Sequence, residues 1–283
     1  MLRDALQIAS QSLKAAALIH QIQYHKAKRS VYGLSFDLVL LTLLQNLHLA
    51  VSFIFYSFSL SIKQYQARYP LSFGDGDNFS GIPMSSLVFL INCISLLAAL
   101  VLLVQIFISY KITRNLSQKF SYTCLMIITG LELKNLYVLF MATSKQGSTN
   151  GMGNHSLLWL DFIYFFNLDS WIYGMLRFMP QASLNFAGIS RFGYAGLSIK
   201  LELLSNILII IQGLCNGQDF EHYPNSEIML NYDVSVLSGV ISLAACLVLL
   251  YQKKIYKNEK PIFVSKYQMI DDNNDNMNEV FEL

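Results

Sequence analysis

Long runs of apolar residues recur along the chain and are separated by short polar segments. A run of about 20 apolar residues is long enough for a helix to cross a bilayer. Five such runs are clear, and a sixth, Leu197–Cys215, carries one acid, Glu202. The five are Phe36–Leu60, Met84–Tyr110, Ser121–Thr143, Leu157–Met179 and Val234–Tyr251. The pattern therefore predicts six membrane-spanning helices.

A weaker candidate, Leu6–Tyr24, precedes these six runs. It contains Lys14 and His20, and a lysine at the centre of a spanning helix costs about 3 kcal/mol on insertion scales. Its apolar residues recur at helical spacing, so the segment is amphipathic. They are Leu2, Leu6, Ala9, Leu13 and Ala16. This pattern fits a spanning helix with a buried polar face, a mitochondrial targeting helix, or one uncleaved helix that is both.

Charge in the connecting segments alternates along the chain. Three connections and the start of the tail are basic, whereas residues 216–233 contain four acids and no lysine or arginine. The basic residues are Lys26, Lys28, Arg29, Lys111, Arg114, Lys119, Arg191, Lys253, Lys254 and Lys257. Because positive loops stay on the cytosolic or matrix side, the alternation predicts seven crossings, with the C-terminus on that side.

Composition agrees with a membrane location. Of the 283 residues, 54% are hydrophobic and only 13% are charged, and the mean hydropathy is +0.41. A soluble domain carries roughly 25% charged residues. The four cysteines lie far apart inside apolar segments, so no disulfide framework or metal site is expected. No catalytic motif is present, and we expect an all-α integral membrane protein that is not an enzyme, has no cofactor and binds no nucleic acid.

Two parts of the chain repeat one another. In each part a glutamine near a helix end is followed by a short loop and then by Gly-Leu-Ser. Gly33 follows Gln21 in this way, and Gly196 follows Gln181 after a slightly longer interval. With one helix between the two parts, the seven helices form a 3+1+3 arrangement. The predicted division is a first triple-helix bundle at 1–110, a linker helix at 111–145, a second bundle at 146–255 and a polar acidic tail at 256–283.

The motifs in these repeats resemble those of the PQ-loop family, and within it the cystinosin-like branch. They are K-R-S-V-Y-G-L-S-F-D (28–37), P-Q-A with N-F (180–186) and L-Y-Q-K-K (250–254), and the resemblance covers roughly residues 15–255. It implies a PQ-loop (SWEET-like) fold in which two triple-helix bundles enclose a substrate cavity. The residues expected to line that cavity are Gln21, Asp37, Gln181, Asn185 and Ser205.

Pro180 has a physical role in this interpretation. A proline removes one backbone donor and frees a carbonyl, so the helix kinks. A kinked helix whose freed backbone faces a cavity can act as the hinge of alternating access. Pro180 is therefore the predicted hinge, although it could also simply end its helix near the membrane interface.

The sequence departs from the family pattern at several positions. His20 replaces the proline of the first motif, and Ser170, Ser205 and Val240 align with a lysine and two acids of the family. Asp37 and Arg177 are retained. The alignment that places Ser205 requires an insertion, so Glu202 could supply the lost acid. Since proton coupling needs an acid that titrates in the membrane, the possible coupling acids are Asp37, Asp169 and Glu202.

Two further charges, Glu132 and Lys134, lie in the predicted linker helix. They are too close in sequence to face each other on one helix. Each therefore needs another partner, on a neighbouring helix or on another subunit.

Two functions remain open from the sequence. The replaced coupling residues, the missing proline and the acidic tail favour an accessory or structural subunit of a larger membrane complex, in the mitochondrial inner membrane. The alternative is a cystinosin-like transporter of cystine or another small amino acid in a lysosomal or vacuolar membrane. The expected partners are membrane lipid with either other membrane subunits or a small amino-acid solute.

Overall fold

The computed structural model describes residues 2–68, 85–114, 118–144, 157–189, 192–216 and 228–258. All regular secondary structure in these residues is helical. The acidic tail predicted at 256–283 lies almost wholly outside the described residues.

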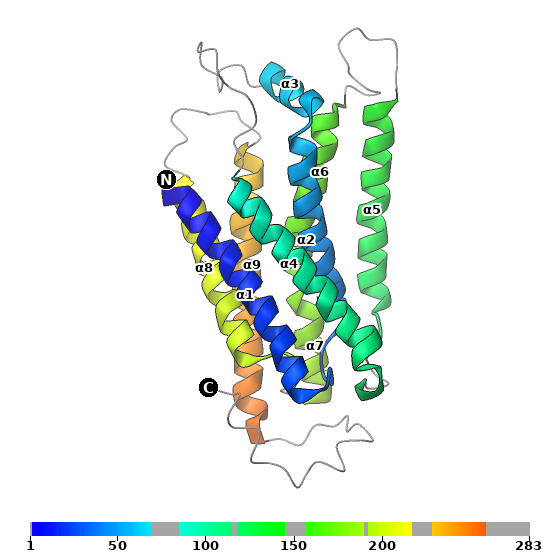
Figure 1. Ribbon diagram of the computed structural model, residues 1–283, viewed down its shortest axis with the longest axis vertical. Coiled ribbons are helices and arrows are strands. Elements are labelled where there is room, and N and C mark those ends of the chain that lie inside the picture. The colour runs from blue at the N-terminus through cyan, green and yellow to red at the C-terminus, as the bar shows by residue number, and fades with distance from the viewer. Residues whose placement is uncertain are drawn as a thin grey trace.

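The helices run up and down an elongated bundle (Figure 1). The long ones are α1 (Leu2–Lys28), α2 (Phe36–Tyr56), α4 (Ser86–Val104), α5 (Tyr122–Thr143), α6 (Trp159–Leu176), α8 (Gly196–Asn216) and α9 (Ile228–Ile255). Two are shorter, α3 (Ser59–Arg68) and α7 (Phe178–Gly188). A π-helical turn, Gln105–Ser109, extends α4, and single 3-10 turns occupy Lys111–Thr113 and Tyr256–Asn258.

Serine residues begin three of the long helices. The hydroxyl of Ser35 accepts a hydrogen bond from the backbone N–H of Leu38, and Ser85 and Ser121 cap α4 and α5 in the same way. A serine at this position satisfies one of the backbone donors that a helix start leaves without an intrahelical partner. The caps therefore fix where α2, α4 and α5 begin.

Five helical segments are long and apolar enough to cross a membrane. They are Phe36–Tyr56, Ser86–Ser109, Tyr122–Thr143, Gly196–Cys215 and Val234–Ile255. Two of the expected spans fall outside this set. The sequence run Leu157–Met179 is divided, because α6 ends at Leu176 and α7 begins at Phe178. The other is α1, whose polar residues lower its hydropathy.

The polar residues of α1 face the inside of the bundle. Ser10, Gln11, Lys14 and Gln21 are all buried, and α1 packs against α4 and α8. Burial of a polar face against neighbouring helices supports the view of α1 as a bundle helix.

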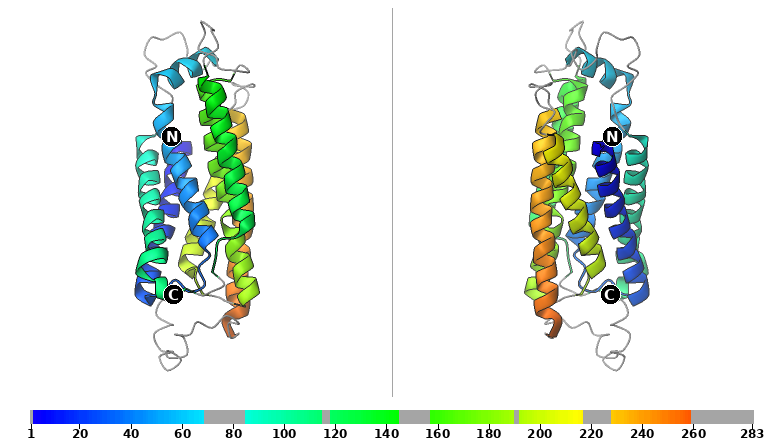
Figure 2. Two further views of the ribbon diagram at one scale, coloured as in Figure 1. Left: turned by 90° about the vertical axis from the view of Figure 1, so that its right-hand side faces the viewer. Right: turned by 90° about the vertical axis from the view of Figure 1, so that its left-hand side faces the viewer.

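The remaining helices pack in two groups. In one group α4 contacts both α1 and α2, and in the other α9 contacts α6, α7 and α8. Contacts of α1 with α8 and of α2 with α6 join the groups. Helix α5 packs on α6 and lies on the outside of the bundle (Figure 2, left). Only 17% of the apolar stretch of α5 is buried inside the protein, whereas 56% of the corresponding stretch of α2 is buried. Most of α5 therefore faces outward.

The short helix α3 crosses one end of the bundle and contacts α6 (Figure 1). The Gln64 side chain accepts a hydrogen bond from the backbone N–H of Leu160, and Arg68 forms an ion pair with Asp161. The apolar run predicted to continue to Leu60 therefore ends at Tyr56, and the chain turns across the bundle.

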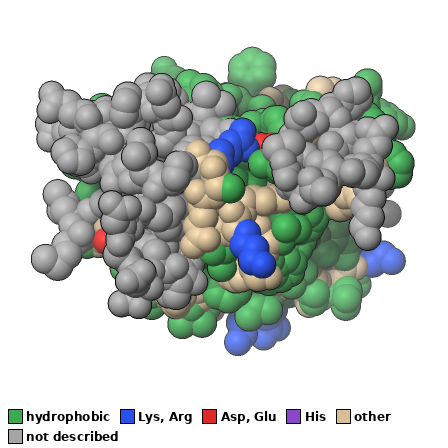
Figure 3. Space-filling view, turned by 90° about the horizontal axis from the view of Figure 1, so that it is seen from above, with side chains coloured by type: hydrophobic (Ala, Val, Ile, Leu, Met, Phe, Trp, Pro, Cys, Tyr) green, Lys and Arg blue, Asp and Glu red, His purple; other side chains and the backbone are tan. Residues whose placement is uncertain are grey.

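The connections α1–α2, α4–α5 and α7–α8 lie at the opposite end, together with the end of α9 (Figure 1). Among the described residues, Lys26, Lys28, Lys111, Lys253 and Lys254 lie at this end. Seen from the other end, hydrophobic side chains of the described residues form much of the outer rim (Figure 3). Both features fit helices that stand across a bilayer with their basic loops on one side.

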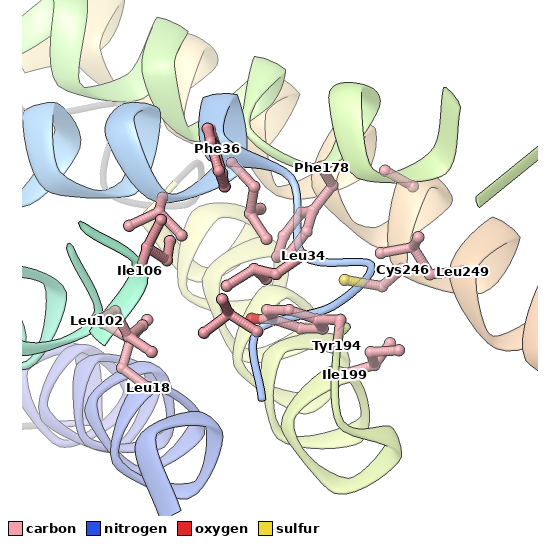
Figure 4. Close-up of a cluster of buried hydrophobic side chains, with 14 of the residues drawn as sticks. Leu18, Leu34, Phe36, Leu102, Ile106, Phe178, Tyr194, Ile199, Cys246 and Leu249 are labelled. Atoms are coloured by element: carbon pink, nitrogen blue, oxygen red, sulfur yellow. The ribbon is translucent and has the colours of Figure 1, made fainter. Parts of the chain in front are cut away.

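A hydrophobic core occupies the basic end of the bundle (Figure 4). Leu34, from the α1–α2 connection, and Tyr194, from the α7–α8 connection, lie among side chains of seven helical segments. These neighbours include Leu18, Leu102, Phe178, Ile199 and Leu249. The core therefore anchors the two connections inside the protein, rather than leaving them as surface loops.

Candidate functional site

Two glutamines hold two connections in place across the molecule. The Gln21 side chain donates to the carbonyl of Gly193 (2.7 Å) and accepts from the N–H of Ala195 (2.8 Å). Gln181 does the same to Gly33 (2.8 Å) and Ser35 (2.8 Å). We call residues 29–35 the first turn and residues 192–195 the second turn. Each glutamine therefore clamps the turn that belongs to the other half of the chain.

The two turns touch through their glycines. Gly33 has φ +78° and Gly193 has φ +96°, a backbone conformation that favours glycine. A Cβ atom on Gly193 would overlap the backbone of Gly33. Both the backbone angle and the close approach therefore require glycine at position 193.

The hydrogen-bond pattern repeats at a constant interval along the chain. The same interval separates Gln21 from Gln181, Gly33 from Gly193, and Ser35 from Ala195. The second amide hydrogen of each glutamine also goes to a residue four positions on, His25 or Asn185. A further pair of contacts follows the same pattern. Gln105, at the end of α4, donates to the carbonyl of Ile22, and Gln252 of α9 donates to the carbonyl of Ala182. The same interval separates Ile22 from Ala182.

This interval corrects the alignment made from the sequence. Gly193, not Gly196, is the counterpart of Gly33, because it follows Gln181 at the spacing at which Gly33 follows Gln21. The insertion disappears and the register shifts by three positions. The sequence was misleading because a second Gly-Leu-Ser, at residues 196–198, lies just beyond the turn that Gly193 forms.

The break between α6 and α7 follows from Pro180. Proline has no N–H, so it cannot donate to the carbonyl of Leu176, four residues earlier. The α6 helix ends at Leu176, and Arg177 lies in the turn before α7. The predicted hinge residue therefore coincides with a discontinuity in the helix pair.

An ion pair is buried beside this break. The Arg177 guanidinium lies 2.5 Å from the Glu202 carboxylate, and the two residues are 3% and 0% exposed. Lys14 of α1, 8% exposed, is near enough for its charge to interact with both. Arg177 Nε and Glu202 Oε1 are buried and find no partner among the described residues. The cluster joins α1, the α6–α7 break and α8.

Tyr194 of the second turn lies near the same cluster. Burial and the neighbouring Glu202 carboxylate hold the pKa of its phenol well above the usual value. Tyr194 therefore stays protonated and adds no charge to the cluster.

Four of the predicted cavity residues have other contacts. Gln21 and Gln181 are the two clamps, and Asn185 accepts a hydrogen bond from Gln181. Ser205 donates to the carbonyl of Ser10 and so ties α8 to α1. A second contact between these helices joins His20, the replacement for the first proline, to Ser198 at 2.9 Å.

Asp37 lines a different space. Its carboxylate accepts the backbone N–H of Ser121 (3.1 Å) at the start of α5. It borders a cavity of about 450 Å³ between α2, α5, α6 and α7, which also reaches Pro180 and Cys124. Of the residues predicted to share one cavity, Asp37 alone borders this one, so the structure does not bring the predicted set together.

Glu132 and Lys134 find partners inside the chain. Glu132 accepts a hydrogen bond from Tyr173 of α6 (2.8 Å) and is 3.0 Å from His48 of α2. Lys134 pairs with Asp169 of α6 at 2.5 Å. The sequence left open whether the partners of Glu132 and Lys134 lie on a neighbouring helix or on another subunit, and the structure supplies them from neighbouring helices.

Asp169 changes its role as a result. Its carboxylate is engaged by Lys134, away from the Arg177–Glu202 pair, so it acts as an anchor for α5 rather than as a member of that cluster. Among the described residues, no group of three or more His, Cys, Asp or Glu side chains could hold a metal ion.

The sequence missed the position of Lys14. It was noted only as a charge that weakens the first span, whereas in the structure Lys14 is buried and interacts electrostatically with Arg177 and Glu202. The available signal was its position seven residues before the clamp Gln21, two helical turns along α1, which places both side chains on one face.

The fold and the cluster define a helical membrane protein with a buried polar site at a helix break. No family model matches the chain. The uncharacterized protein YCL002C of Saccharomyces cerevisiae is 31% identical over 207 residues, which are 72% of this chain and 76% of the yeast protein. The chain belongs to the same family as that yeast protein. A cystinosin homolog of Arabidopsis thaliana is 24% identical over 255 residues, 88% of this chain and 86% of the plant protein.

Proposed function

We propose that this protein is a PQ-loop-type membrane transporter of a small amino-acid solute. The observation that carries the proposal is the buried Arg177–Glu202 pair beside the Pro180 break. The pair is a buried acid and base at a helix discontinuity, next to the interface of the two helix groups. Such a site can bind a polar solute, and movement at the discontinuity can change the side of the membrane from which the solute reaches it.

The proposed architecture is seven spans in a 3+1+3 arrangement. Helices α1, α2 and α4 form the first bundle, α5 is the linker, and α6–α7, α8 and α9 form the second bundle. The clamps and carbonyl contacts that recur at one constant interval support two equivalent halves. The matching contacts, α1 with α8 and α2 with α6, support a two-fold relation between them.

An accessory-subunit role has lost much of its support. It rested partly on a missing coupling acid, and we propose that Glu202 of α8, buried beside Arg177, takes that role. It rested also on Glu132 and Lys134, which are paired within the chain. The proline missing from the first motif remains, but His20 fills its position with a contact to Ser198.

We further propose a lysosomal or vacuolar membrane as the location. The polar face of α1 is buried against α4 and α8, as a bundle helix requires and a targeting helix does not. The similarity to a cystinosin homolog supports the same choice.

Uptake into proteoliposomes tests the proposal. Purified protein is reconstituted and offered radiolabelled amino acids, with and without a pH gradient. We expect uptake by the wild type and a loss of at least about tenfold in Glu202→Gln, because the substitution leaves Arg177 unpaired and removes the site's only described carboxylate. Glu202→Asp should restore part of the rate.

Asp169→Asn is the matched control. It breaks a second ion pair, in which the Asp169 carboxylate is buried and its partner Lys134 is 33% exposed, outside the proposed site. Comparable destabilisation with retained uptake would separate a functional from a structural effect. Full uptake by Glu202→Gln, or loss only in Asp169→Asn, would refute the assignment of the site. A folded wild type that moves no amino acid would refute the transporter proposal.

A further inference from the structure

The buried cluster contains more positive than negative charge. Lys14 and Arg177 supply two cations, and Glu202 supplies one anion. The other described ionisable groups that interact with Lys14 or Arg177 are the Cys246 thiol and the Tyr194 phenol, which are neutral. One cationic group therefore has no opposite charge within the cluster.

An uncompensated charge in a protein interior is costly, so such a group usually has a functional reason to be there. A surface location would let Lys14 reach water or headgroups, but α1 turns it inward between neighbouring helices. The Lys14 side chain stays largely enclosed.

The cluster also holds polar atoms that are ready for a ligand. Arg177 Nε is a buried donor and Glu202 Oε1 is a buried acceptor, and neither has a partner among the described residues. Buried polar atoms are normally satisfied, and two open ones of opposite type beside one ion pair point to a polar ligand with both donors and acceptors.

We propose that the solute is an acidic amino acid, with two carboxylates and one ammonium group. Such a solute complements the cluster charge for charge: its carboxylates face Lys14 and Arg177, and its ammonium faces Glu202. Lys14 is the residue that sets this preference, since without it the cluster matches a neutral amino acid with one carboxylate. The inference rests on the proposed transport function and names its substrate class.

The position of Lys14 in α1 explains how the solute would gain access. The cluster lies where α1 meets α8, and this interface is held by His20–Ser198 and by Ser205 with the Ser10 carbonyl. These are hydrogen bonds between neutral groups, which can exchange for water or solute at small net cost. Opening of α1 from α8 would expose the two cations and the acid together.

A matched pair of solutes tests the charge preference. L-glutamate and L-glutamine have the same chain length and differ by one negative charge. With radiolabelled forms in proteoliposomes, we expect wild-type uptake to favour glutamate by at least about tenfold, the scale of one hydrogen bond to a charged group. In Lys14→Met the glutamate-to-glutamine ratio should fall to near one, and Lys14→Arg should keep it high.

Thermal stability provides a second measurement that needs no variant. Millimolar glutamate should raise the unfolding temperature of purified wild-type protein, and equal glutamine should raise it much less. This measurement decides the inference even where Lys14→Met fails to fold.

The outcomes separate the inference from the function that it extends. Transport of glutamine as fast as glutamate, or an unchanged ratio in folded Lys14→Met, overturns the acidic preference but leaves the transporter proposal standing. If glutamate and glutamine raise the unfolding temperature equally, the acidic preference is overturned as well. Uptake of no amino acid by the wild type overturns both.

Discussion

Replacing the clamp Gln181 with leucine should destabilise the protein strongly. Its side chain is fully buried and satisfies the carbonyl of Gly33 and the N–H of Ser35 in the first turn. Leucine is of similar size but has no polar atoms, so both backbone groups would stay buried without a partner. Each unsatisfied group costs about 1–3 kcal/mol, which gives roughly 2–6 kcal/mol in total.

The assay is thermal unfolding of detergent-purified protein. For a chain of this size, 1 kcal/mol corresponds to about 2–4 °C, so the unfolding temperature should fall by roughly 5–20 °C. Gln23→Leu is the control, because Gln23 is exposed on α1 only two residues from the other clamp. Gln21→Leu should behave like Gln181→Leu, since Gly193 and Ala195 depend on Gln21 in the same way.

The double variant adds a further test. The two clamps hold turns that touch each other at Gly33 and Gly193. Loss of one clamp already loosens that contact. The fall in unfolding temperature of the double variant should therefore be smaller than the sum of the falls in the two single variants. A shift in Gln181→Leu no larger than that in Gln23→Leu would refute the clamp argument altogether.

Three other substitutions follow from the packing. Gly193→Ala should prevent folding or cost at least about 3 kcal/mol, because of backbone strain and overlap with Gly33, and the measurement is the yield of folded protein in detergent. Gly130→Ala is the control: a Cβ at Gly130 meets open space, so the yield should not fall. Lys134→Met should cost about 3–5 kcal/mol in unfolding assays by leaving the Asp169 carboxylate buried and unpaired; equal stability would show that the pair is dispensable. Pro180→Ala should raise the unfolding temperature and slow uptake, because a continuous helix resists hinging; faster uptake would argue against a hinge.

The sequence predicted the helical membrane character well, because apolar runs and basic loops follow directly from the bilayer. It also predicted Pro180 as a point of discontinuity, because the missing N–H is a property of the residue itself. The burial of the polar face of α1 inside the bundle was one of the interpretations that the sequence left open.

The site was harder to predict because it depends on long-range contacts. A matching Gly-Leu-Ser placed the second turn too late in the chain, whereas only the positive φ of Gly193 and its contact with Gly33 identify the true turn. The partners of Glu132 come from α2 and α6, 84 and 41 positions away. No local pattern encodes such distances, so the sequence showed that Glu132 needs a partner but did not identify it.

The central claim is that solute passes a site sealed by the α1–α8 interface, and a reversible cross-link tests it most directly. Ser10→Cys and Ser205→Cys, introduced after the native cysteines are replaced, would put one thiol on α8 at the place of the Ser205 hydroxyl and one on α1 at the residue whose carbonyl that hydroxyl contacts. We predict that oxidation, or a short thiol-reactive bridge, stops amino-acid uptake in proteoliposomes and that a reductant restores it. Undiminished uptake by fully cross-linked protein would contradict the account.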